Sequence, residues 1–258
     1  WGYRLGLRKG NFKEESTFDI WSQDMTDYCK RDVEVCHLLY KLIEAEKYST
    51  DAFKLEHSFA YWINKQEKDG VDFDETSAQK LHSILVKRKV DLEEKLQTIF
   101  PAWQKSLGFK TYKRDNRKKG IKAGVPKEIF KTEIFNPNSR DQIGDRLKTL
   151  GWKPKEFTAT GKPEVSEKIL KTLPYPEAKL IAEHLMVQKR LGQLSDGDQA
   201  YLKLNKRGKI YGKVITNGAI SGRCTHHSPN LAQVVSKGSE YGSEMRSLFV
   251  APTDMVMF

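Results

Sequence analysis

The stretch that decides the fold reads Lys209-Ile-Tyr-Gly-Lys-Val-Ile-Thr-Asn-Gly218, followed by Ala219-Ile-Ser-Gly-Arg-Cys-Thr-His-His-Ser-Pro-Asn-Leu-Ala-Gln233. Side-chain character alternates from Ile210 to Thr216, which predicts a β-strand. Asn217-Gly218 favours a tight hairpin turn, because this dipeptide tolerates positive φ angles. In Ser221-Gly222-Arg223 the glycine lets another molecule come close to the backbone. We therefore predict a strand and a turn that present Arg223 to the surface of a ligand.

Three polar side chains of this stretch suit the minor groove of DNA. Every base pair presents acceptor atoms there, in a pattern that hardly distinguishes sequences. Arg223 is a donor, and the amides of Asn230 and Gln233 can donate to the same acceptors. The alternative interpretation is a surface turn followed by a polar loop, and this alternative is favoured for the three-residue motif taken alone.

The longer pattern resembles family A DNA polymerases, and most of all the replicative enzymes of T7-like phages. Ser221-Gly-Arg, Pro229-Asn-Leu-Ala-Gln and Met245-Arg-Ser-Leu-Phe are similar to the family's Thr-Gly-Arg, Pro-Asn-Leu and Arg-x-x-Phe motifs. The resemblance implies that Arg223, Asn230 and Gln233 contact the primer–template minor groove near the primer end. It also implies that Arg246 lies close to the nucleotide site.

Three positions depart from the family pattern. Ser221 replaces the usual threonine, and Val235 stands where the family usually has proline. The basic residue that faces the incoming triphosphate in the family has no clean match. Lys237 is the nearest candidate for that role.

Composition limits the classes of protein to which the chain can belong. Its 258 residues allow one large or two modest domains, and the formal net charge of +11 points to polyanionic partners. The alternative is a solvated basic surface without a partner. No run of 18 apolar residues occurs, so no membrane span is expected. The cysteines (Cys29, Cys36 and Cys224) lack CxxC spacing, which predicts free buried thiols. Free thiols are typical of a reducing cytoplasm, which is that of a bacterial host if a phage encodes the chain.

A helix is expected from Asp24, its N-cap, to Lys47, and it places Tyr28 and Asp32 one turn apart. A carboxylate with a tyrosine one turn back can hold a divalent ion and orient its water, although this spacing is common by chance. Tyr28-Cys-Lys-Arg-Asp32 resembles the third motif of the family's 3′–5′ proofreading exonuclease. The resemblance implies that Tyr28 and Asp32 are catalytic and that Asp32 is a metal ligand. One carboxylate cannot hold two metals, so we expect no DNA hydrolysis by the chain itself.

The middle of the chain predicts a helical thumb. Helices are expected over 54–68 and 75–99, separated by a short extended piece and the capping residue Asp74. The segment 101–135 contains ten Lys and Arg residues against three acids, and its centre is predicted to be a flexible loop. It either contacts the DNA backbone or is simply solvated. T7-like relatives carry a longer insertion here that binds thioredoxin, and we do not expect that partner for the shorter segment.

Two more helices carry candidate phosphate contacts. One is expected to begin around Pro137 and Ser139 and to reach Leu150. The resemblance to the family's thumb tip implies that Asn138, Ser139 and Arg140 touch the duplex backbone, whereas simple capping is the alternative. The other is expected over Pro176–Gln193, and its Lys189-Arg190 pair implies a phosphate contact or a favourable interaction with the helix dipole. Short helices are expected over 165–172 and 241–249, and Asp254 begins a final strand without a catalytic role.

The predicted fold class is mainly α with small β (α+β), with long antiparallel thumb helices and a partial antiparallel palm sheet. The expected domains are the end of an exonuclease domain (1–50), a thumb with a basic loop at 101–135 (51–204) and the start of a palm (205–258). Both ends suggest an internal fragment, cut before the first catalytic aspartate. The resemblance implies a parent polymerase that uses Mg²⁺ and deoxynucleotides. We expect the chain alone to bind primer–template DNA weakly and to add no nucleotide.

Two alternatives to the polymerase interpretation stay open. The chain is either a self-contained basic nucleic-acid-binding module or a different metal-dependent nuclease. The nuclease would need a complete metal cluster, built from acids such as Asp24, Asp27 and Asp32.

Overall fold

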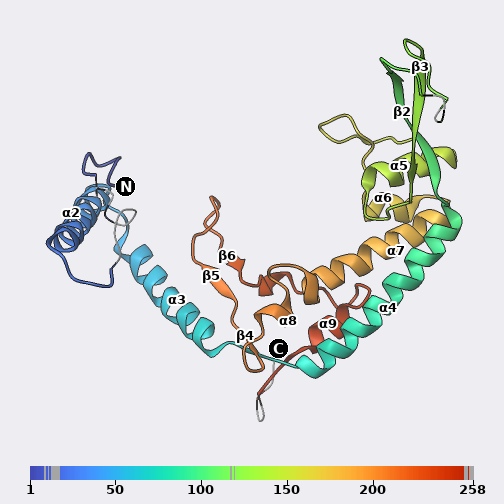
Figure 1. The fold of residues 1–258 in the computed structure, drawn as a ribbon. Coiled ribbons are helices and arrows are strands. Elements are labelled where there is room, and N and C mark those ends of the chain that lie inside the picture. Colours follow the sequence, from blue (N-terminus) through green and yellow to red (C-terminus); the bar gives the residue numbers. More distant parts are fainter. Residues whose placement is uncertain are drawn as a thin grey trace. The chain divides into compact units, whose positions relative to one another are not determined.

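The computed structural model describes residues 1–8, 10, 12, 18–116, 118, 120–252 and 255. The chain forms two compact units, one of residues 1–66 with 216–223, and one of residues 67–215 with 224–258. Helices dominate and the sheets are small and antiparallel (Figure 1), which confirms the predicted α+β class. Within the described residues, no helix has the length and hydropathy that a membrane crossing requires.

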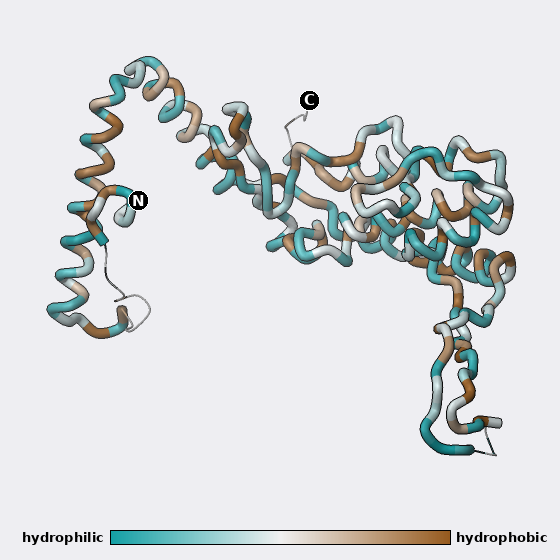
Figure 2. Tube along the Cα trace, turned by 90° about the horizontal axis from the view of Figure 1, so that it is seen from above, coloured by the Kyte–Doolittle hydropathy of each residue, from teal (hydrophilic) through white to brown (hydrophobic). Residues whose placement is uncertain are grey.

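The first unit is built on α2 (Gln23–Ala45) and most of α3 (Thr50–Asp69). Ser22 caps α2, since its Oγ accepts a hydrogen bond from the Met25 amide at 3.1 Å; the prediction that Asp24 is the cap was wrong. Val35 is the one buried residue among those described in α2. Apolar residues recur along both helices (Figure 2) without being covered by the described residues. Cys29 and Cys36, both in α2, are exposed, and Cys224 is half-buried. The prediction of buried thiols was therefore wrong.

The second unit is organised by α4 (Glu75–Ile99) and α7 (Pro176–Leu191), which pack side by side (Figure 1). The helices are antiparallel: the start of α4 shares a core with the end of α7, and the end of α4 shares a second core with the start of α7. The predicted inward positions of α4 are all buried: Ala78, Leu81, Leu85, Leu92 and Leu96. Their spacing of three, four and seven places them on one helix face. An ion pair between Arg88 and Glu183, 2.5 Å long, also joins the two helices.

A three-stranded antiparallel sheet closes one end of this helix pair. Strand β1 (Val71–Phe73) lies between β4 (Lys209–Ile210) and β7 (Phe249–Val250). Directly after β1, Asp74 caps α4 as predicted, and its carboxylate accepts from the Ser77 amide at 2.9 Å. Hydrogen bonding with the side chain of Ser77, and then with its backbone amide, lowers the pKa of Asp74. The predicted helix over 241–249 is shorter than expected, because α9 covers Gly242–Ser247 and Phe249 pairs with Phe73 in the sheet.

The predicted strand from Ile210 to Thr216 is interrupted. Gly212 separates β4 from β5 (Lys213–Ile215), and a Cβ at this position would lie 2.8 Å from Leu231 Cδ1. Strand β5 pairs with β6 (Thr225–His227), with Ile215 opposite Thr225. The connection therefore spans 216–224 instead of a two-residue turn. Asn217 has the positive φ that was predicted, at 53°.

The far end of the α4–α7 pair carries further elements of the second unit. These are α5 (Arg140–Thr149), α6 (Glu167–Thr172) and an antiparallel hairpin of β2 (Trp103–Thr111) and β3 (Pro126–Glu133). The expected basic loop over 101–135 was too long, because Trp103–Thr111 and Pro126–Glu133 are strands. After α7 come a π-helical turn (Gly192–Asp196), α8 (Tyr201–Leu204) and a 3-10 turn (Leu231–Gln233). Asp254, predicted to begin a strand, lies outside the described residues.

Candidate nucleic-acid interface

Arg223 belongs to the first unit, at the end of the connection 216–224. Its backbone is held by a turn, in which Ala219 N donates to Arg223 O at 3.0 Å and Gly222 N donates to Ala219 O at 2.9 Å. Gly222 has a φ of 76°, which a glycine adopts without strain. The Arg223 side chain is exposed, and its guanidinium forms no hydrogen bond or ion pair with a described residue. All of its donors are available to a ligand.

Asn230 and Gln233 belong to the second unit, where packing positions their loop. Pro229 is buried, and Leu231 lies against Gly212. Gln233 N donates to Asn230 O at 3.2 Å, and the Gln233 side chain is exposed. Asn230 Oδ1 is buried and has no hydrogen-bond partner among the described residues.

Arg246 and Lys237 occupy different environments, although both were predicted to lie near a nucleotide. Arg246 Nε donates to Val235 O at 2.6 Å, so this guanidinium already ties α9 to the 231–235 segment. It lines a cavity of about 210 Å³ together with Val71, Leu231, Val234 and Phe249. Lys237 is exposed and has no ion pair with a described residue. The described residues thus leave Lys237 free and give Arg246 a structural role.

Lys189 and Arg190, the two cations at the end of α7, lie in different surroundings. Lys189 is exposed, whereas Arg190 is only 7% exposed. Arg190 Nε donates to Glu240 O at 3.2 Å, and Nη1 donates to Gln193 Oε1 at 3.3 Å. Burial lowers the pKa of this guanidinium. A phosphate contact predicted for both residues therefore suits Lys189 alone, because successive residues of a helix are rotated by about 100° and face different surroundings.

The start of α5 is capped by its own side chains. Ser139 Oγ accepts from the Gln142 amide at 3.4 Å, as the sequence predicts. In a capping box, Gln142 Oε1 would accept from the Ser139 amide. It accepts instead from the Asn136 amide at 2.7 Å, so only half of the predicted capping box forms. Arg140 donates to Val165 O. Asn138 is exposed and is the residue of this group most open to a ligand.

Tyr28 and Asp32 form no metal site with the other residues that the structure describes. The Tyr28 ring lies 5.6 Å from Phe12 and 6.1 Å from Phe18 between ring centroids, in an aromatic cluster. No group of three His, Cys, Asp or Glu side chains within the described part of the chain could hold a metal ion. Asp24 and Asp27 therefore do not complete a site with Asp32. The described residues do not fit a two-metal centre.

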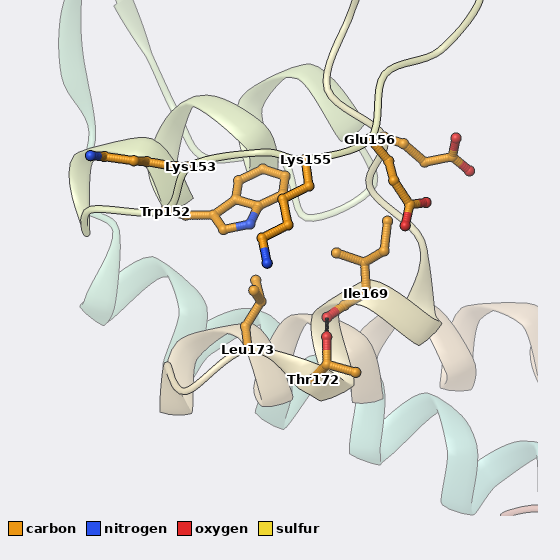
Figure 3. A pocket seen from close by; sticks show the side chains of 8 residues that line it. Trp152, Lys153, Lys155, Glu156, Ile169, Thr172 and Leu173 are labelled. Carbon is orange, nitrogen blue, oxygen red and sulfur yellow. Dashed lines mark hydrogen bonds between the residues drawn. The ribbon is translucent and has the colours of Figure 1, made fainter.

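A cavity beside α6 in the second unit was not predicted from the sequence. It measures about 300 Å³ and is lined by Trp152, Lys153, Lys155, Glu156, Glu164, Ile169, Thr172 and Leu173. Figure 3 shows the Lys155 ammonium pointing in beside the Trp152 ring, while Lys153 points away. The residues that line this cavity come from three separate segments of the chain and share no motif. No local sequence pattern therefore predicts the cavity.

Comparison with known proteins places these elements in a family. The sequence profile of DNA polymerase family A matches residues 113–258. The chain belongs to DNA polymerase family A. Two members similar to it are the DNA-directed DNA polymerases of Escherichia phage T7 and Enterobacteria phage T3, each 31% identical over 97% of this chain and 47% of the relative. This family A chain thus spans about half the length of those relatives.

A solved family A structure has a similar fold. It is the POL domain of Pol1 from M. smegmatis in complex with DNA primer-template and dNTP, with a TM-score of 0.56 and 16% identity. The match covers 74% of this chain and 28% of that chain. At this identity the likeness supports the fold, and residue roles need arguments of their own.

Proposed function

We propose that the chain is the part of a template-directed DNA polymerase that holds primer–template DNA. Family A membership and the formal charge of +11 support this proposal. The observation that carries it is the exposed Arg223, whose guanidinium has no partner among the described residues. Arg223, Asn230 and Gln233 would donate to minor-groove acceptors, which hardly differ between base pairs. Such contacts hold a paired duplex irrespective of its sequence.

We propose secondary roles for four exposed or accessible groups. Lys189 and Asn138 would contact phosphates of the duplex, and Lys237 would face the triphosphate of an incoming deoxynucleotide. Arg246 would act through the loop that it ties to α9, by keeping Leu231 and its neighbours in place. Two phage relatives are polymerases, which supports action in the cytoplasm of a bacterial host.

The whole polymerase is proposed to use Mg²⁺, which would stabilise charge on the reacting phosphate groups. Within the described residues no cluster of acids and histidines fits such an ion. We therefore assign the chain's residues to binding and orienting DNA. Within the described part of the chain, Asp24, Asp27 and Asp32 are not part of such a cluster. Independence from a thioredoxin-type partner stays a prediction.

Replacing Arg223 by alanine is expected to weaken primer–template binding about tenfold. A charge-assisted hydrogen bond contributes about 1.5–3 kcal/mol, and 1.4 kcal/mol corresponds to a factor of ten. Fluorescence anisotropy with a labelled primer–template, at constant low salt, measures the change in Kd. Folding is expected to be unaffected, because the side chain is exposed.

The matched control is Arg31→Ala, which removes an exposed arginine paired with Glu34 on α2 at 3.3 Å. It changes the net charge equally and is expected to change Kd less than twofold. Equal losses for Arg223→Ala and Arg31→Ala would show that only overall charge matters. That outcome would contradict the proposed minor-groove role.

A further inference from the structure

The Asn217-Gly218 pair lies in the connection 216–224, and both of its residues are exposed. Asn217 has a φ of 53°, a left-handed conformation that asparagine adopts more readily than most residues. The Gly218 amide donates to no described residue, and the Asn217 side chain forms no hydrogen bond with one. The described part of the chain therefore leaves the side-chain amide and the following backbone nitrogen open to water.

Asparagine is one of the thermolabile residues, because its side-chain amide can react with the main chain. The backbone nitrogen of the next residue attacks Cγ and loses its proton to hydroxide or water, while the Cγ–Nδ2 bond breaks and ammonia leaves. Water then opens the resulting cyclic imide at one of its two carbonyl carbons. One opening gives aspartate, and the other gives isoaspartate, in which the main chain passes through the former side chain. The sequence of steps consumes water, releases ammonia and needs no oxidant.

Two asparagines near the start of α5 lack the arrangement that this reaction needs. Asn136 is followed by Pro137, which has no N–H to release. Asn138 is followed by Ser139, whose amide donates to Asn136 O at 2.9 Å. A side chain on the attacking residue also obstructs its approach, whereas a glycine has none. Asn138 is thus exposed like Asn217, but the nitrogen that follows it is engaged and more crowded.

Two other asparagines are held by hydrogen bonds of their own side chains. Asn64 Nδ2 donates to Ala60 O at 2.9 Å, within α3. Asn205 Nδ2 donates to Glu75 Oε2 at 2.7 Å. Of the asparagines compared here, Asn217 combines an exposed side chain that no described residue binds with a glycine at the next position.

The Asn217 side chain lies beside the turn that carries Arg223. Asn217 Oδ1 is 3.6 Å from the position that a Cβ on Gly222 would take. The same turn is closed by the hydrogen bond from Ala219 N to Arg223 O at 3.0 Å. A carboxylate at residue 217 would attract the guanidinium of Arg223, because opposite charges this close interact even near the surface. An isoaspartyl linkage would also lengthen the main chain directly before the turn.

We propose that Asn217 is a site of spontaneous deamidation, and that the aspartate or isoaspartate formed there weakens the binding of DNA by Arg223. The second part rests on the proposed function, since it assumes that Arg223 contacts the duplex. The new carboxylate offsets one positive charge of the DNA-binding surface and repels phosphates. The reaction is faster in alkaline buffer, because the attacking nitrogen must lose its proton. The affinity of the chain for DNA is therefore expected to fall as the protein ages.

The test of the modification site incubates the chain in mildly alkaline buffer and follows its tryptic peptides by mass spectrometry. Cleavage after Lys213 and Arg223 releases peptide 214–223, in which Asn217 is the one asparagine. Peptide 132–140 contains Asn136 and Asn138 and serves as the internal comparison. We expect peptide 214–223 to gain the mass of deamidation at least about tenfold faster than peptide 132–140. Enzymatic methylation of isoaspartate then identifies the isoaspartyl product.

Gly218→Ala is the matched variant for the chemical step, because a Cβ obstructs the attacking nitrogen. Gly218 is not among the described glycines with positive φ, so alanine is expected to fit the backbone. The variant is expected to slow conversion of peptide 214–223 at least about tenfold. Equal rates for the variant and the unaltered chain, or equal rates for peptides 214–223 and 132–140, would overturn the modification site.

Asn217→Asp carries the charge of the product from the start and tests the consequence for binding. It is expected to weaken primer–template binding about threefold to tenfold and to make the slope of log affinity against log salt shallower by about 0.9. Gln66→Glu adds the same charge at an exposed position of the first unit and is expected to change Kd less than about twofold. The unaltered chain is expected to approach the Kd of Asn217→Asp during incubation, whereas Gly218→Ala keeps its affinity.

The chemical and the functional parts of the proposal fail separately. If Asn217→Asp binds DNA as the unaltered chain does while Arg223→Ala weakens binding, the modification does not act on Arg223 and the second part is wrong. If Arg223→Ala itself leaves Kd unchanged while peptide 214–223 converts as expected, the minor-groove assignment is wrong and the modification site stands.

Discussion

Replacing Gly242 by alanine is expected to destabilise the second unit by at least about 3 kcal/mol. A Cβ at this position would lie 1.9 Å from the carbonyl oxygen of Ser236, and Gly242 itself is buried. The obstructing atom belongs to the backbone, so no side-chain rotation relieves the overlap. The 236–241 segment or α9 must move instead. Urea unfolding, followed by circular dichroism, measures the loss.

Gly238→Ala is the matched control for this substitution. Nothing lies within 4 Å of a Cβ built on Gly238, and alanine restricts the unfolded chain. This variant is therefore expected to be unchanged or stabilised by about 0.4–1 kcal/mol. Similar losses at both positions would show that the close approach of α9 to Ser236 does not hold in solution. Because Lys237 lies in the displaced segment, Gly242→Ala is also expected to weaken any contact that Lys237 makes.

Replacing Arg190 by alanine is expected to lower the free energy of unfolding by about 2–4 kcal/mol. The substitution removes the hydrogen bonds to Glu240 O at 3.2 Å and to Gln193 Oε1 at 3.3 Å. It also removes the aliphatic stem from a site where the residue is 7% exposed. The measurement is the same urea titration.

Lys189→Ala provides the comparison on the neighbouring position. Lys189 is exposed, so its removal is expected to change stability by less than about 0.5 kcal/mol. The Lys189→Ala substitution is expected to remove one phosphate contact with DNA. The slope of log affinity against log salt concentration then becomes shallower by about 0.9. If Lys189→Ala destabilises the fold as much as Arg190→Ala, the separation of structural and binding roles at the end of α7 is wrong.

The long helices of the second unit could be predicted because their apolar spacing and caps are local. The stripe from Ala78 to Leu96 and the cap at Asp74 both hold in the structure. The hairpin could not be predicted, since the bulge at Gly108 breaks the alternation of β2. Lysine-rich strands also resemble solvated charge runs when only the sequence is considered. Pairing across the hairpin is non-local, so no local pattern predicts it.

The residue types of the candidate site could be predicted from the sequence, but the burial and the hydrogen bonds of their side chains could not. Family resemblance pointed to Arg190 and Arg246, but both guanidinium groups are engaged with backbone carbonyls. Nothing in the spacing distinguishes Lys189 from Arg190, because burial depends on what packs against each side of α7. Gly212 was expected inside a strand, whereas it lies between β4 and β5 and close to Leu231. These features depend on contacts between segments far apart in the sequence.

The central claim is that the chain holds paired DNA through groups that do not read its sequence. It is tested most directly by measuring Kd at one low salt concentration for two primer–templates of unrelated sequence and for the matching single strands. The account predicts that the two primer–templates bind with Kd values within about twofold of each other, and that each single strand binds at least about tenfold more weakly. Equal affinity for single-stranded and paired DNA, or a strong preference for one sequence, would contradict it.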